Sequence, residues 1–404
     1  MKREVVVTGL GIVSPIEAGA GIDIFWQGLC NGKNTIKPIK SFNVNGHKCK
    51  VGGEIADFKR FLDDAYFDSY DKCTQLFALA TQQALKDSRI NYKSSTIGIV
   101  FGTILGGIIS GAKYMDDVFM KAQKSEDGTL LRDYSLHSIP ASIAKKWAFD
   151  GPNICINTAC AAGADAIGQA YREIQNGRAD IMLAGGADTL SEFVFRGFSA
   201  LGALTQHGMV QPFDKNRSGL ALSEGSGVVV LEAKEHAIAR NAEIYCSVKG
   251  FGSTNDAYNI VRPHTTGDGL SRAIDIAISE SQISHSEVDY ISAHGTGTIY
   301  NDLMETRAIK RSFGEESKNL KISSIKSMLG HSLGASAVIE AIHCVKVMQN
   351  SIVPPTINYL NKDMECNLDY VPNKALHKDV NISMSLSAGF GGQNAVLVLE
   401  NNTR

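Results

Sequence analysis

The stretch that decides the fold is Cys155-Ile156-Asn157-Thr158-Ala159-Cys160-Ala161-Ala162-Gly163-Ala164-Asp165-Ala166-Ile167-Gly168. An extended run from Asn153 to Thr158 changes abruptly into small residues, which then carry an apolar pattern of helical period. We predict a strand, a sharp turn and a helix, with Cys160 at the turn. The small side chains around this cysteine let backbone or substrate approach it closely.

A thiol at the start of a helix lies beside free backbone amides, whose partial positive charge favours an anion. This setting is expected to lower the pKa of the Cys160 thiol, which makes it a candidate nucleophile. The alternative is a buried structural cysteine, the common role of a free cysteine, and we assign that role to Cys155 inside the strand.

Composition narrows the class of protein. The chain has 404 residues, enough for two domains or one large duplicated domain, and 44% hydrophobic with 20% charged residues is typical of a globular core. A net charge of −2 indicates neither nucleic acid nor an anionic membrane as partner. The eight cysteines show no metal-ligand spacing, the start of the chain does not resemble a signal peptide, and no apolar run reaches membrane-spanning length. We therefore expect a cytoplasmic protein without a metal.

Four segments of the first half recur in the same order after residue 245. They pair 5–11 with 245–252, 99–103 with 290–296, 157–163 with 326–334, and 228–232 with 395–400. Each half alternates strands and helices, which predicts βαβ units and mostly parallel sheets, with a loop at 9–11 after the first strand. We infer an internal duplication into halves 1–245 and 246–404, which puts His331 at the position of Cys160, each at a helix start.

The chemistry centres on a cysteine and two histidines. His294 and His331 follow strand-like runs in glycine-rich surroundings. A cysteine with two imidazoles can perform acyl transfer, in which a thiolate attacks a thioester and imidazole N–H groups stabilise an oxyanion or enolate. Lys326 and Glu340, if buried, need each other or the imidazoles as partners. The glycine-rich stretch 387–394 lacks P-loop spacing, and we predict a flexible loop that completes an oxyanion hole.

These motifs resemble the β-ketoacyl-acyl-carrier-protein synthases, in the KAS I/II (FabF-like) branch of the thiolase superfamily, which also includes polyketide ketosynthases. The resemblance covers essentially the whole chain and rests on residues 157–160, 293–298, 301–302, 305–306, 326–331 and 389–394. It implies an α/β thiolase-like fold, internally duplicated in five layers αβαβα, and a homodimer.

By this resemblance, Cys160 takes the acyl group from an acyl-carrier-protein thioester. His294 and His331 promote the decarboxylation of malonyl-carrier protein and stabilise the enolate, which attacks the acyl-enzyme. The backbone amides of Cys160 and Ala388 hold the oxyanion. No metal or redox cofactor is required, because the phosphopantetheine belongs to the carrier. Further roles implied are support by Lys326, Glu340, Ala388 and Phe390, substrate binding by Thr296, Thr298 and Leu105, and carrier docking by Lys72.

The chain also departs from the family pattern. The family usually has Phe, a gate beside the nucleophile, where this chain has Ala388. We predict an open site that accepts bulky acyl groups, unless Leu220 or Phe390 fills the gap, and fatty-acid elongation and polyketide or other secondary-metabolite synthesis both fit. The alternative function is a non-catalytic subunit like a chain-length factor, which shapes the pocket of a heterodimer and typically lacks the cysteine.

Overall fold

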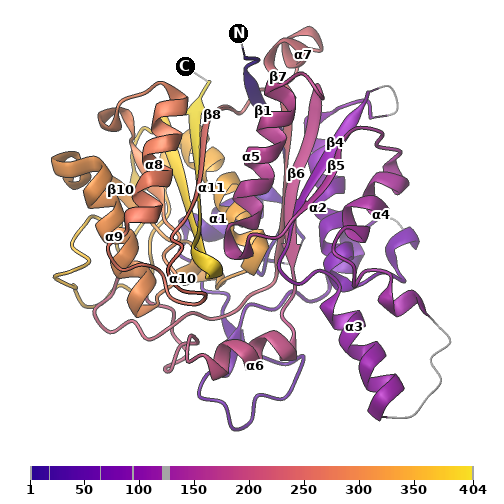
Figure 1. The fold of residues 1–404 in the computed structure, drawn as a ribbon, viewed down its shortest axis with the longest axis horizontal. Coiled ribbons are helices and arrows are strands. Elements are labelled where there is room, and N and C mark those ends of the chain that lie inside the picture. The colour runs from indigo at the N-terminus through magenta and orange to yellow at the C-terminus, as the bar shows by residue number, and fades with distance from the viewer. Residues whose placement is uncertain (1, 18, 64, 93–94, 121–127, 403–404) are drawn as a thin grey trace.

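Figure 1 shows the computed structural model, which describes all residues except 1, 18, 64, 93–94, 121–127 and 403–404. In the described residues, ten strands form the largest sheet, in the order β10-β9-β13-β14-β8-β1-β7-β6-β4-β5. The first half of the chain supplies β1 (Val5–Val13), β4 (Ile97–Gly102), β5 (Asn153–Ile156), β6 (Ile181–Asp188) and β7 (Gly225–Ala233). The second half supplies β8 (Cys246–Asn255), β9 (Tyr290–Ser292), β10 (Lys321–Ser323), β13 (Ile382–Gly389) and β14 (Gln393–Asn401).

The two halves repeat one strand order, β5-β4-β6-β7-β1 and β10-β9-β13-β14-β8. In each half the first two pairings are parallel and the last two are antiparallel. This repeat confirms the predicted duplicated α/β fold, whereas the prediction of mostly parallel sheets is wrong. The reason is visible at β13 and β14, which are joined by a turn of three residues that only an antiparallel pair allows. The division into halves 1–245 and 246–404 stays a prediction, since both contribute to one sheet.

The two halves of the sheet enclose a central pair of helices, α5 (Ala162–Gln175) and α11 (Ser336–Asn350), which pack on each other. The helix α2 (Lys72–Ser88) covers β1 and β7, and α8 (Asp268–Ser281) covers β8 and β14. Figure 1 shows α5 between the strands of the two halves, with α8 and α9 (Ile299–Phe313) on the left and α2 and α4 (Ser138–Trp147) on the right. The resulting order of layers confirms the predicted αβαβα architecture.

Shorter elements surround this core. They are α1 (Ile22–Cys30), α3 (Ile108–Met115), α4 (Ser138–Trp147), α6 (Glu192–Ala200), α7 (Lys234–Ala239), α10 (Lys326–Leu329) and the two-residue strands β2 (Lys37–Pro38), β3 (Val51–Gly52), β11 (Ile352–Val353) and β12 (Leu376–His377). Across the described part of the chain, no helix is both long and apolar enough to span a membrane.

Gly9 and Gly11 lie inside β1, so the prediction that they form a loop is wrong. A Cβ atom on Gly11 would clash with the carbonyl oxygen of Ala80 in α2, so the glycine lets the helix lie directly on the strand. The second half repeats this contact, since a Cβ atom on Gly252 in β8 would clash with the carbonyl oxygen of Ala273 in α8. The glycines that interrupt the apolar pattern therefore serve helix–sheet packing.

Candidate active site

Cys160 lies in a short 3₁₀ turn, Ala159–Ala161, between β5 and α5. The strand ends at Ile156, two residues before the predicted end at Thr158. Ala159 has a φ of 52°, in the left-handed region, which turns the chain sharply just before the cysteine. Cys160 itself is 5% exposed. The predicted strand, turn and helix are therefore present, and they bury the thiol at the point where the chain reverses.

The second half has the same turn, but His331 is not in it. Leu333 has a φ of 54° and begins the 3₁₀ turn Leu333–Ala335 that leads into α11. Cys160 therefore corresponds to Gly334, and the prediction that His331 occupies the equivalent position at a helix start is wrong. The sequence match was offset because α10 is inserted between β10 and this turn. The start of α5 meets this second turn, since a Cβ atom on Gly163 in α5 would lie 2.7 Å from the carbonyl oxygen of Gly334.

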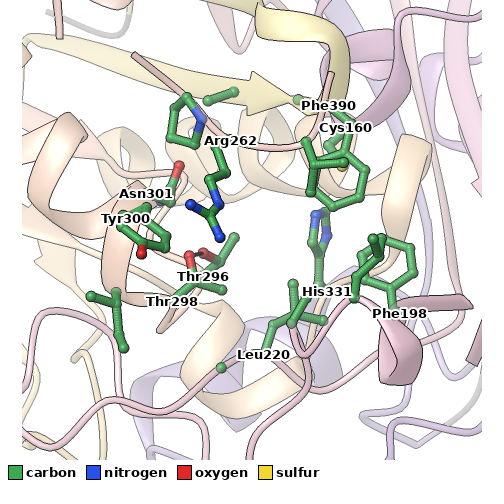
Figure 2. Close-up of a pocket in the computed structure, with 18 of the residues that line it drawn as sticks. Cys160, Phe198, Leu220, Arg262, Thr296, Thr298, Tyr300, Asn301, His331 and Phe390 are labelled. Carbon is green, nitrogen blue, oxygen red and sulfur yellow. Dashed lines mark hydrogen bonds between the residues drawn. The ribbon is translucent and has the colours of Figure 1, made fainter. Parts of the chain in front are cut away.

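Cys160, His294 and His331 line one cavity of about 200 Å³. The two imidazole rings meet edge to face, with centroids 5.3 Å apart and planes at 85°. Figure 2 shows the His331 ring pointing toward Cys160. His294 follows β9, and its backbone N–H donates to the buried carboxylate of Glu305 at 2.6 Å, which fixes this loop beneath the pocket. The structure thus brings together the cysteine and two histidines that were predicted to act together.

Both imidazoles are neutral, because burial holds the pKa of each histidine well below its usual value and the positive charge of Lys326 lowers it further. Nδ1 of His331 accepts a hydrogen bond from the backbone N–H of Leu333 at 3.2 Å. Nδ1 of His294 lies 3.4 Å from Nζ of Lys326, an ammonium that can only donate. In both rings the proton therefore sits on Nε2, so the cavity is supplied with two imidazole N–H donors.

Lys326 and Glu340 form a buried ion pair beside His294, with side chains 2% and 1% exposed. Burial raises the pKa of Glu340 to about 7, and Lys326 acts in the opposite direction. Two charges removed from water need such mutual compensation, as the sequence suggested for this pair. The pair places a positive charge next to His294, which keeps that imidazole from taking up a proton.

The expected lowering of the Cys160 pKa is wrong. Burial raises the pKa of the Cys160 thiol to about 12, although the charge of Lys326 and the backbone amides of Phe390 and Cys160 act to lower it, while the carboxylate of Asp188 raises it further. The helix α5 begins only at Ala162, after the 3₁₀ turn. Cys160 is therefore protonated at rest, because desolvation outweighs the helix end and the nearby lysine.

Four further predicted site residues, Thr296, Thr298, Ala388 and Phe390, line the same cavity. Leu105 does not. It packs at the edge of a neighbouring apolar cluster with Phe198 and Leu220, so its predicted contact with substrate stays a prediction. The predicted flexible loop over 387–394 is also smaller than expected. The pairing of β13 with β14 includes Ala388 and Gly389, which leaves only Phe390–Gly392 as the turn.

Lys72, the predicted carrier-docking residue, has other partners. Its ammonium donates to Glu224 at 2.6 Å and to the backbone oxygen of Ile55 at 2.8 Å, and its side chain is 29% exposed. A half-buried lysine already neutralised by a buried carboxylate has little charge to offer a partner, so this pairing argues against the predicted role.

Sequence reasoning missed two residues that shape the site. The Phe198 ring, from α6, stacks on the Phe390 ring with centroids 5.3 Å apart. Asp188 ends β6, is fully buried, and accepts hydrogen bonds from the backbone amides of Leu105 at 2.9 Å and Gly334 at 2.7 Å. It thereby ties a loop of the first half to the turn before α11. Asp188 could have been noticed in the sequence because it is an acidic residue at the end of an apolar strand.

Among the described residues, no group of three or more His, Cys, Asp or Glu side chains is arranged to hold a metal ion. All eight cysteines are free thiols, and the two nearest in sequence, Cys155 and Cys160, are not joined.

Comparison with known proteins identifies the family to which this chain belongs. Family models described as "Beta-ketoacyl synthase, N-terminal domain" and "Beta-ketoacyl synthase, C-terminal domain" match residues 2–237 and 245–360. The chain belongs to the β-ketoacyl synthase family. This confirms the family resemblance that the motifs indicated, over both halves of the chain.

Named relatives of this β-ketoacyl synthase cover its full length. The 3-oxoacyl-(acyl-carrier-protein) synthase 2 of Synechocystis sp. (strain ATCC 27184 / PCC 6803 / Kazusa) is 39% identical, over 99% of this chain and 98% of that protein. The synthase 2 of Staphylococcus aureus (strain COL) is 37% identical with the same coverage. Among solved structures, the ishigamide ketosynthase/chain length factor matches with a TM-score of 0.93 at 34% identity, over 99% of this chain and 100% of that chain. A second match is the structure of a type II polyketide synthase acyl-carrier protein in complex with its ketosynthase bound to the hexaketide. The TM-score is 0.90 and the sequence identity 34%, with the same coverage.

Proposed function

We propose that this β-ketoacyl synthase catalyses a decarboxylative Claisen condensation. An acyl thioester held on Cys160 reacts with malonyl-acyl-carrier protein and yields a β-ketoacyl-carrier protein, in fatty-acid elongation or in polyketide or secondary-metabolite synthesis. The observation that carries the proposal is a buried thiol facing two neutral imidazoles that both present Nε2–H to one cavity. The relatives named as 3-oxoacyl-(acyl-carrier-protein) synthases and the ketosynthase bound to its carrier protein support it.

In the first half-reaction, the sulfur of Cys160 attacks the carbonyl carbon of the acyl-carrier thioester. A new S–C bond forms, the S–C bond to the carrier breaks, and the carrier thiol leaves with the proton that Cys160 gives up. The charge of Lys326 and the backbone amides of Phe390 and Cys160 favour the thiolate that attacks. The backbone amides of Cys160 and Ala388 are the proposed donors to the oxyanion.

In the second half-reaction, malonyl-carrier protein occupies the emptied arm path. The Nε2–H groups of His294 and His331 donate to its thioester oxygen, so that carbon dioxide leaves and the electron pair remains as an enolate. The enolate carbon attacks the acyl carbonyl on Cys160, the S–C bond to the enzyme breaks, and the cysteine takes up a proton. Neutral imidazoles suit this role, because a proton already on Nε2 is a hydrogen-bond donor without adding charge. In this scheme the phosphopantetheine of the carrier is the only prosthetic group.

The partners we propose are the acyl-carrier protein and a second copy of the chain, with neither nucleic acid nor membrane. The strand β5 is the last in the sheet order, and Ile154 and Ile156 on it are half-buried. Pairing with the β5 of a second copy would extend the sheet and cover both side chains. We place the protein in the cytoplasm, where a reducing environment keeps its eight thiols free.

The second candidate is a partner subunit of a ketosynthase heterodimer, without catalysis, because one matched structure pairs a ketosynthase with a chain length factor. Mass spectrometry after incubation with acyl-carrier thioester separates the two. The proposal expects an acyl adduct on the peptide that contains Cys160, absent in Cys160→Ala, followed by ketoacyl product when malonyl-carrier protein is added. A folded wild-type protein that never acquires the adduct would favour the partner subunit.

A further inference from the structure

One cation stands at the mouth of the catalytic cavity. Arg262 is exposed and lines the same cavity as Thr296, Thr298 and Tyr300, at the end away from the thiol. Figure 2 shows its guanidinium directed toward the two threonines, while Cys160 and His331 lie on the other side of the cavity. The two hydroxyl oxygens lie 2.9 Å apart, so this wall of the opening is polar.

No described carboxylate forms an ion pair with Arg262, whose guanidinium instead lies 5.1 Å from the centroid of the Tyr300 ring. Other exposed arginines of the second half are neutralised, since Arg272 and Arg311 both pair with Asp268, and Arg307 pairs with Glu365. Contact with an aromatic face orients a guanidinium and leaves its five N–H donors largely free for an anion.

Hydrogen bonds within the loop and to a neighbouring turn fix the backbone around Arg262. The side-chain oxygen of Asn259 accepts hydrogen bonds from the backbone amides of Val261 at 2.9 Å and Arg262 at 3.0 Å. The carbonyl of Ile260 accepts one at 2.8 Å from the amide of Gly391, in the turn beside the cavity. An arginine on a fixed loop loses less conformational freedom when it binds a ligand.

We propose that Arg262 binds the phosphate ester of the phosphopantetheine arm on which carrier-bound substrates enter. This inference rests on the proposed function, which supplies such an arm. The planar guanidinium matches two phosphate oxygens with parallel N–H donors. The carboxylate of a malonyl group is the other anion available, but it must reach the imidazoles beside Cys160, whereas Arg262 is exposed at the opening. Thr296 and Thr298 then line the path of the neutral part of the arm.

The test compares acyl donors with and without the phosphate. Acylation of Cys160 is measured by mass spectrometry with acyl-carrier protein, acyl-phosphopantetheine and acyl-pantetheine, for the wild type, Arg262→Ala and Arg262→Lys. We expect Arg262→Ala to lose about tenfold in kcat/KM with the two phosphate-bearing donors and to match the wild type with acyl-pantetheine. Arg262→Lys keeps the positive charge but not the planar pair of N–H donors. Its kcat/KM with the phosphate-bearing donors should fall between those of the wild type and Arg262→Ala. Arg272→Ala, an exposed arginine outside the cavity, is the control and should keep the wild-type preference.

An equal loss with acyl-pantetheine would overturn the assignment, because no phosphate is then involved. It would also be overturned if Arg262→Ala impaired only malonyl thioesters, with or without phosphate, since that result identifies the carboxylate as the ligand. Calorimetric titration with free phosphopantetheine and pantetheine gives a readout without catalysis. The expected result is weaker binding of phosphopantetheine alone in Arg262→Ala. If the wild type binds phosphopantetheine and pantetheine but Cys160 is never acylated, the proposed function is refuted. The binding test of Arg262 remains valid in that case.

Discussion

The backbone amide of Leu333 donates a hydrogen bond of 3.2 Å to Nδ1 of His331, which makes Nε2 the nitrogen that carries the proton. Leu333 begins the left-handed turn before α11, so the helix start in the second half sets the tautomer of a histidine that shares a cavity with Cys160 of the first half. The duplicated fold thus orients a hydrogen-bond donor across the interface of its two halves.

The first prediction concerns this donor. His331→Ala should lower malonyl-carrier decarboxylation by about a hundredfold to a thousandfold, the usual cost of removing one donor to an oxyanion or enolate. Acylation of Cys160 should fall less, because the enolate is formed only in the second half-reaction. Carbon dioxide release and acyl-enzyme formation are measured separately, with His285→Ala, a partly buried histidine away from the cavity, as control. Equal losses in both half-reactions would indicate that His331 acts as a general base toward the thiol.

The second prediction concerns the protonation of Cys160. A pKa of about 12 means that the thiolate fraction rises about tenfold per pH unit throughout the range in which proteins stay folded. Inactivation of the free enzyme by iodoacetamide should therefore accelerate from pH 6 to pH 9 without levelling off. Lys326→Met should slow it at each pH, because the lysine charge lowers the pKa of the thiol. A plateau below pH 8 would mean that the helix end outweighs burial.

The third prediction concerns the ion pair of Lys326 and Glu340. Glu340→Ala should destabilise the protein by roughly 3 kcal/mol, since it leaves a buried ammonium without a counter-charge. The double variant Lys326→Met with Glu340→Leu should regain most of this stability, because it removes both desolvated charges. Denaturant unfolding of the single and double variants measures the difference. If the double variant is as unstable as the single one, packing rather than charge accounts for the loss.

The pH dependence of the same pair has a defined sign. Burial raises the pKa of Glu340 to about 7 in the folded protein, above its usual value near 4.5. A raised carboxyl pKa means that the folded state binds this proton more tightly than the unfolded state. The contribution of Glu340 to stability is therefore largest below the unfolded pKa and declines as the pH rises through 7. Comparing Glu340→Gln with the wild type at pH 5 and pH 8 isolates this contribution.

The fourth prediction concerns Ala388. Ala388 lines the same cavity as Cys160. The nearby Phe390 ring is stacked on the Phe198 ring. Ala388→Phe should fill space that a bulky acyl group needs, and so should block branched or aromatic acyl donors while sparing straight-chain ones. Acylation of Cys160 is compared across both kinds of donor, with exposed Ala257→Ser as control. An unchanged ranking of donors would show that Leu220 and Phe390 already restrict the site.

Much of the fold and of the candidate site could be predicted from the sequence, because the patterns that indicate them are local. The turn around Cys160 follows from small residues after an apolar strand, and the glycine-flanked histidines come directly after predicted strands. The duplication was legible because matching strands keep matching patterns, and β1 and β8, β4 and β9, and β7 and β14 do occupy equivalent places in the sheet. These features depend on residues close together in the chain, which a sequence shows directly.

The tertiary structure decided what depends on the surroundings of a group. The pKa of Cys160 was misjudged because the sequence shows the helix that follows the thiol but not the layers that exclude water from it. The partner of Lys72 is Glu224, 152 positions away, and no local pattern announces such a pairing. The sequence comparison aligned His331 with Cys160, but α10 lies between β10 and the turn of the second half. This insertion puts Gly334, and not His331, at the position equivalent to Cys160. Motif and period determined which residues meet, whereas burial and long-range pairing, set only when the halves pack together, determined the charge that each one carries.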